Sequence, residues 1–238
     1  MALDRLDPAL DRFREAHFWI HTLEEFYHYA DPFRWHLNAF LKSLKEVPQL
    51  IQMGLQNVSG FPDWFSTARN TLRADPLMKV LFDHRDFVVH RGMLVPDSFS
   101  TIGITEGSGI KLGVRFPLDP LEDSDDAMHR YLVFAAKEDD FLGLLIPDEE
   151  SLPCVHRVWR IQPFTEEIVS LASQAWLRTG EMVEAVIRWL GYDPPGELSL
   201  DCRHSRQSLE FRLFDRDKLR NEFATIREAH ALKVGMDS

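Results

Sequence analysis

The chain of 238 residues has only two cysteines, Cys154 and Cys202, and no long apolar run. Two cysteines so far apart do not form a disulfide framework, and such proteins are usual in a reducing cytoplasm. The charged N-terminal segment lacks the apolar core of a signal peptide. No segment approaches the roughly 20 apolar residues that cross a bilayer. We therefore expect a cytoplasmic protein without a membrane contact.

Motifs for cofactors are also missing. The sequence contains no glycine-rich phosphate loop, no GxSxG nucleophile elbow and no CxxC pair. These motifs hold nucleotide phosphates, a nucleophilic serine, and a metal or redox dithiol, respectively. We expect neither a cofactor nor a resident metal.

Positive charge is in short supply. The chain has 27 Lys and Arg against 38 Asp and Glu, which gives a formal net charge of −11. Broad electrostatic binding of nucleic acid needs a basic surface that releases counterions from the phosphates. The balance argues against broad binding of nucleic acid, leaves room for a nuclease with a small basic pocket, and makes a basic protein partner an equally good inference.

Residues 75–92, DPLMKVLFDHRDFVVHRG, predict a helix with both ends marked. Asp75 can cap its first turn, and Gly92 can adopt the left-handed conformation that ends a helix. Arg85 falls on a line of apolar residues, where its permanent charge needs an anion. Two partners for Arg85 remain possible: a carboxylate of the same chain, or the phosphate of a bound ligand.

The same helix places Asp86 and His90 one turn apart, so their side chains can meet. The carboxylate would fix the tautomer of the imidazole, and the helix dipole favours a protonated histidine in the last turn. An arginine to hold charge and a histidine to move a proton are suited to phosphate chemistry.

The segment RDFVVH, residues 85–90, resembles the Arg-x(4–6)-His motif of the HEPN superfamily, in which Asn, Asp or His often follows the arginine. The helical pattern of residues 8–92, rejoined at 164–191, is also similar to a HEPN bundle. Many HEPN proteins are metal-independent ribonucleases or toxins that act as dimers, whereas others are non-catalytic scaffolds. The resemblance therefore implies a HEPN-like helical bundle, a homodimer and RNA as a substrate.

Two functions follow from this resemblance. In a metal-independent endoribonuclease, Arg85 would bind the scissile phosphate, His90 would act as general base or acid for the 2′-hydroxyl, and Asp86 would orient His90. In a non-catalytic interaction protein, Arg85 would bind a carboxylate of its own chain, and the acidic surface would meet a basic protein partner or an antitoxin.

The fold class that we predict is α+β, with three parts. Residues 1–92 and 164–191 form the bundle, with a bend or break at Pro48 and a helix cap at Thr165. Residues 93–163 form a β-rich insertion with strands at 99–105, 110–116, 129–136 and 155–161. Residues 192–238 form a hairpin, 197–202 with 209–214, and a final helix capped by Asp215.

Three further groups of residues have alternative interpretations. His17, His21, Glu24 and His28 share one face of the first helix, which suits a metal but more often is a solvated or interface face. Arg69 and Arg73 either form a basic patch with Arg85 or pair with Asp63 and other acids, and we favour the pairs. Basic residues of the predicted strands are expected on the outer face of the sheet: His129, Arg130, His156, Arg157 and Arg160.

Overall fold

The computed structural model describes residues 3–91, 96–106, 109–116, 118–138, 151–196, 198, 200, 201 and 209–236, and at 87–91, 106, 111, 116, 138 and 233–236 it describes the backbone alone. The chain divides into two compact units. The first, here called the helical unit, comprises Met1–Phe26, Asp31–Val95 and Phe164–His204. The second, the sheet unit, comprises Tyr27–Ala30, Pro96–Pro163 and Ser205–Ser238.

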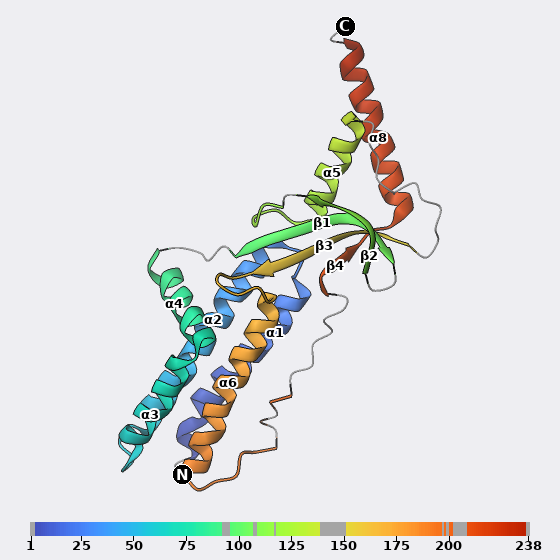
Figure 1. Cartoon of the computed structure of the whole chain (residues 1–238). Helices are drawn as coiled ribbons and strands as arrows, with labels where there is room; N and C mark the ends of the chain where they lie inside the picture. Colours follow the sequence, from blue (N-terminus) through green and yellow to red (C-terminus); the bar gives the residue numbers. More distant parts are fainter. Residues whose placement is uncertain are drawn as a thin grey trace. The chain divides into compact units, whose positions relative to one another are not determined.

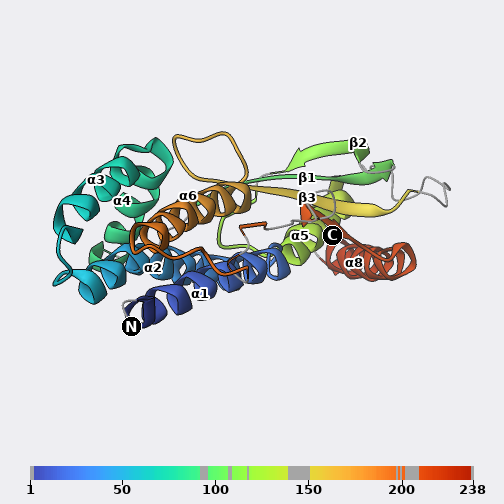
Figure 2. The same cartoon turned by 90° about the horizontal axis from the view of Figure 1, so that it is seen from below.

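The helical unit is built from long helices that run side by side (Figures 1 and 2). A short 3-10 turn, η1 (Leu3–Leu6), leads into the first helix, and α6 packs along α1. Helix α3 packs against α4, and both contact α6. The helices are α1 (Asp7–Glu25), α2 (Ala30–Leu55), α3 (Phe61–Ala74), α4 (Pro76–Arg91) and α6 (Ile168–Trp189).

Local capping sets several helix ends. The Asp75 carboxylate accepts hydrogen bonds from the backbone N–H groups of Leu77 and Met78 at 2.9 and 3.1 Å, which confirms the predicted cap of α4. Helix α6 is capped by Glu167 instead of Thr165, because the Glu167 carboxylate accepts from two backbone N–H groups of the first turn. Gly191 has a φ of +83°, the left-handed conformation that ends a helix.

Two interior helix positions show how residues that disfavour helices are accommodated. Of the predicted bend or break at Pro48 the break is wrong, because helix α2 continues from Ala30 to Leu55 with Pro48 buried in its packed face. Gly180 of α6 allows a close approach, since a Cβ there would lie 2.8 Å from the ring of Phe13 and 2.4 Å from Leu200. The Phe13 ring in turn stacks on Trp176 at 4.7 Å.

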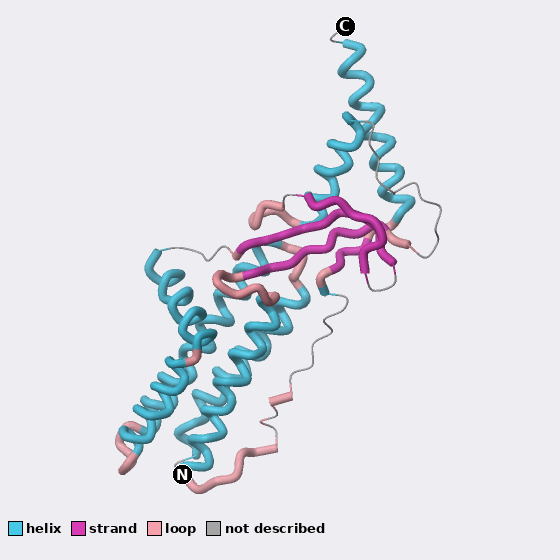
Figure 3. The backbone as a smooth tube through the Cα atoms, viewed as in Figure 1, coloured by secondary structure: helices cyan, strands magenta, loops and turns pink. Residues whose placement is uncertain are grey.

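The sheet unit contains a four-stranded antiparallel sheet in the order β2-β1-β3-β4 (Figure 3). The predicted hairpin is confirmed, with Ile102 of β1 opposite Val114 of β2 and Val155 of β3. The strands are β1 (Asp97–Glu106), β2 (Gly109–Phe116), β3 (Pro153–Arg160) and β4 (Phe211–Leu213), and the helices are α5 (Ser124–Glu138) and α8 (Arg216–Met236).

Two predictions for this unit were wrong. Residues 129–136 lie in α5, because Met128, Leu132 and Ala135 bury one helical face rather than one face of a strand. Strand β4 pairs with β3, so the described part of 197–214 contains no hairpin. The C-terminal segment therefore joins the β-rich region in one unit, and its helix α8 packs on α5.

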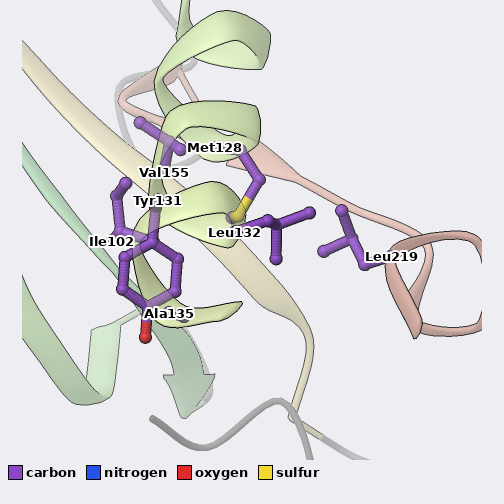
Figure 4. Close-up of a cluster of buried hydrophobic side chains, with 7 residues drawn as sticks. All are labelled: Ile102, Met128, Tyr131, Leu132, Ala135, Val155 and Leu219. Atoms are coloured by element: carbon purple, nitrogen blue, oxygen red, sulfur yellow. The ribbon is translucent and has the colours of Figure 1, made fainter. Parts of the chain in front are cut away.

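The core of the sheet unit lies between the sheet and its two helices (Figure 4). Apolar side chains from strands β1 and β3 meet those of α5, and Leu219 of α8 completes the cluster. Its members are Ile102, Met128, Tyr131, Leu132, Ala135, Val155 and Leu219. The arrangement confirms the α+β class. No helix in the described part of the chain is long and apolar enough to cross a membrane.

Candidate functional site

Helix α4, which carries the RDFVVH segment, is fixed to the helical unit at its N-terminal end. Leu77, Met78 and Leu81 are buried in the core. The second oxygen of the capping carboxylate, Asp75 Oδ2, accepts from Arg178 Nε of α6 at 2.6 Å. Further along α4, the polar side chains of Lys79, Asp83 and Asp86 lie beside residues of α2 and α3.

Asp86 is engaged by two cations of its own chain. Its Oδ1 atom accepts from Lys45 Nζ of α2 and, at 3.3 Å, from Arg85 Nη1. The hydrogen bond from Lys45 is the main reason that the pKa of Asp86 is lowered, and Arg85 acts in the same direction. The Asp86 carboxylate is therefore ionised at neutral pH. Of the two anions predicted for Arg85, the structure shows a carboxylate of the same chain, that of Asp86.

The side chain of His90 lies outside the described residues, so its contact with Asp86 stays a prediction. The same holds for Gly92 as the stop of the helix. What the structure adds is the second partner, Lys45, which lies 41 residues away in the sequence. Sequence spacing within one helix gives no signal for such a partner.

A pocket of about 380 Å³ lies between α2, α3 and α4 beside this ion network. Its charged lining is contributed by all three helices and consists of Lys45, Arg69, Arg73, Lys79, Asp83 and Asp86. Pro48, Leu72 and Phe82 supply apolar wall. We call this site the α2–α3–α4 pocket.

Arg69 and Arg73 do not form the ion pairs that we favoured from the sequence. In the part of the chain that the structure describes, neither has an acidic partner, and Asp63 is not paired with them. Both instead line the α2–α3–α4 pocket. The Nε atom of Arg69 is buried and has no hydrogen-bond partner among the described residues.

Of the four residues predicted to share one face of the first helix, the structure brings together only three. His17 and His21 face each other with 3.2 Å between their Nε2 atoms, and Glu24 lies 2.8 Å from the other nitrogen of His21. His28 instead lies in the sheet unit, where it contacts Ser124. No group of three or more His, Cys, Asp or Glu among the described residues is arranged to hold a metal.

A second surface of α1 was missed in the sequence. Phe18 is 60% exposed, and at helical spacing it falls on one line with the exposed residues Asp7, Asp11 and Glu25. Arg14 is exposed on the same side. A helical projection of the solvent side would have found this surface, which we call the acidic aromatic face.

Aromatic rings extend this face toward α2. Trp19 meets Phe18 edge to face at 5.1 Å and stacks on His36 of α2 at 5.6 Å. The Trp19 indole N–H donates to the Glu15 carboxylate at 3.1 Å, which orients the ring. Trp35, next to His36 in the chain, is 54% exposed.

These features define an α+β protein whose helical unit carries a cation-lined pocket and an acidic aromatic face. Over residues 6–111 the chain is similar to a family described as bacteriophage lambda protein ea47. No curated protein and no solved structure matches it. The family match includes the RDFVVH segment and is not to a HEPN family. The HEPN resemblance was therefore wrong, because a short Arg and His spacing on a helix occurs in unrelated bundles.

Proposed function

We propose that this protein is a non-catalytic interaction protein that binds a basic protein partner on the acidic aromatic face of α1. The supporting observation is Phe18, whose exposed ring lies on one helical line with Asp11 and Glu25. Buried aromatic anchors dominate the binding energy of many protein interfaces. The surrounding carboxylates would steer a partner rich in Lys and Arg to this face.

The ion network on α4 favours binding over catalysis. In the catalytic alternative the Arg85 guanidinium has to hold a phosphate. In the described residues Arg85 Nη1 instead donates to Asp86 Oδ1, which also accepts from Lys45. The arginine of the segment is thereby paired within one chain, which is the arrangement expected of an interaction protein.

Site-specific photocrosslinking in the full chain tests the proposal. Because the similar family is named for a bacteriophage protein, bacterial proteins are the partners to search first. We expect a benzophenone side chain at position 18 to capture a partner with a basic surface, which is then purified for affinity measurements. The triple variant Asp7→Asn, Asp11→Asn, Glu25→Gln should bind it at least tenfold more weakly.

The matched control removes the same charge elsewhere in the helical unit. Asp63→Asn, Glu181→Gln and Asp193→Asn replace three exposed acids outside the acidic aromatic face. This variant should keep the affinity of the parent chain within about twofold. Equal losses in both variants, or a captured partner with an acidic surface, would contradict the proposal.

The second candidate is a metal-independent endoribonuclease, and the cations that line the pocket beside Arg85 favour it. Arg85 would bind the scissile phosphate, and His90 would assist attack by the 2′-hydroxyl with Asp86 as its orienting group, leaving cyclic phosphates. Two copies would bring two α4 helices together. RNA cleavage in EDTA, lost in His90→Ala and kept in the control His84→Ala, would support this candidate. No cleavage of any RNA would exclude it.

A further inference from the structure

The α2–α3–α4 pocket concentrates positive charge in a chain that is strongly acidic. Its lining contains four cationic side chains, Lys45, Arg69, Arg73 and Lys79, against Asp83 and Asp86. Asp86 is already bound by Lys45 and Arg85. Three of the cations, Arg69, Arg73 and Lys79, have no ion-pair partner in the described ranges. Like charges gathered in one pocket repel one another unless an anion joins them.

One arginine of the lining also has a donor without an acceptor. The Nε atom of Arg69 is buried and makes no hydrogen bond within the described residues. An unsatisfied buried donor costs about 1–3 kcal/mol, and more when the group is charged. An anion in the pocket would pair with the guanidinium groups of Arg69 and Arg73, because guanidinium groups match phosphate oxygens in geometry.

The volume and the apolar lining of the pocket indicate what the ligand carries besides its anionic group. A volume of about 380 Å³ falls in the range of small-molecule sites. Leu72 and Phe82 line it, and Lys45 Nζ lies 5.8 Å from the centre of the Phe82 ring. The ligand should therefore combine an anionic group with a flat or apolar body.

We propose that the α2–α3–α4 pocket binds a small phosphomonoester of nucleoside monophosphate size. The lining carries two more cationic than acidic side chains, and a phosphomonoester carries about 1.5 to 2 negative charges at neutral pH. A long polyanion such as RNA would also meet the acidic surface of a chain with a net charge of −11, whereas one phosphate meets only the local cations. The inference is independent of the partner surface, because none of the residues that line the pocket belongs to that surface.

Titration calorimetry on the full chain with the four nucleoside monophosphates tests the inference. At least one should bind, and its nucleoside without phosphate should not. Arg73→Gln with Lys79→Gln should weaken binding at least tenfold, and both side chains are exposed, so the fold should be kept. Arg14→Gln with Arg188→Gln removes the same charge from exposed positions outside the pocket and should leave the affinity within about twofold.

Three results would overturn the inference. The first is that no nucleoside monophosphate binds. The second is equal binding by the pocket variant and the control variant, which would place the ligand elsewhere. The third is that inorganic phosphate, or an oligouridylate RNA, binds while every mononucleotide fails, which would assign the cations to a bare anion or to RNA.

Discussion

The guanidinium carbon of Arg157 lies 3.7 Å from the centre of the Trp159 ring, on a side of β3 that is closed to solvent. Arg157 donates from Nη1 to the carbonyl oxygen of Glu122 at 2.8 Å and from Nε to Ser98 Oγ at 2.9 Å. Its exposed fraction is 0%, so burial lowers the pKa of the guanidinium. A cation held in this way links β3, β1 and the segment before α5.

Replacing Arg157 with alanine should destabilise the protein by about 3–5 kcal/mol, because it leaves buried acceptors unpaired and opens a cavity under Trp159. Urea denaturation followed by circular dichroism measures the change. The control Arg130→Ala breaks an exposed pair with Glu122 and should cost about 1 kcal/mol or less. A similar loss of unfolding free energy in the two variants would show that the buried contacts of Arg157 stabilise the protein no more than an exposed ion pair does.

The stability of the sheet unit should fall as the pH drops below about 6.5. Burial lowers the pKa of His28 from 6.5 to about 4, although a hydrogen bond with the Leu209 carbonyl acts in the opposite direction. The unfolded chain then takes up a proton that the folded chain does not. The stabilisation present above pH 6.5 is therefore lost progressively toward pH 4, by about 3 kcal/mol in total.

Unfolding free energies measured between pH 7 and pH 4.5 test this dependence on His28. The variant His28→Gln should lose most of the slope, although it is less stable at pH 7. The exposed His129, which pairs with Glu222, provides the control His129→Gln. An unchanged slope in His28→Gln would assign the dependence to other groups.

Removing Lys45 should raise the pKa of Asp86 toward its ordinary value, because the hydrogen bond from Lys45 is the main cause of the lowered pKa. A carboxyl titration by NMR of Lys45→Met measures the shift. The exposed Lys42 supplies the control Lys42→Met, in which Asp86 should titrate as in the parent. Because Asp86 is about half exposed, the loss of stability should be about 1 kcal/mol or less.

Gly180→Ala should destabilise the helical unit even though alanine is the better helix former. The propensity gain is about 1 kcal/mol, whereas overpacking typically costs about 1–3 kcal/mol. The new methyl group would meet the Phe13 ring, which cannot move freely because it stacks on Trp176. Thermal unfolding should show a lower Tm for Gly180→Ala and little change for Gly196→Ala, where nothing lies within 4 Å of the added Cβ. A higher Tm for Gly180→Ala would refute the close packing.

Local patterns were enough to predict several helix ends. The caps at Asp75 and Asp215 depend on hydrogen bonds within a few residues. The apolar run of residues 129–136 was different, because it suits a strand and a helix equally well. Packing against α8 decides in favour of α5, and that helix is more than 75 residues further along the chain.

Charged residues were the hardest to place. Arg157 was expected on the outer face of the sheet, yet alternation with Val155 and Trp159 puts it on the inner face of β3. Its burial depends on acceptors at Ser98 and Glu122 that no sequence pattern brings near. The candidate site shows the same limit, since Arg69 and Arg73 meet Lys45 and Lys79 in one pocket only through the packing of three helices.

The sequence by itself determined several helix ends, the first hairpin, the α+β class and the polar composition of α4, because these depend on short-range hydrogen bonds and on hydrophobic period. Tertiary structure alone decided the partners of the charged groups: Lys45 binds Asp86, and the Glu122 carbonyl and Ser98 hydroxyl oxygens accept hydrogen bonds from Arg157. The physical reason is that an ion pair or a buried cation depends on distance and solvent access in space, and neither is set by separation along the chain.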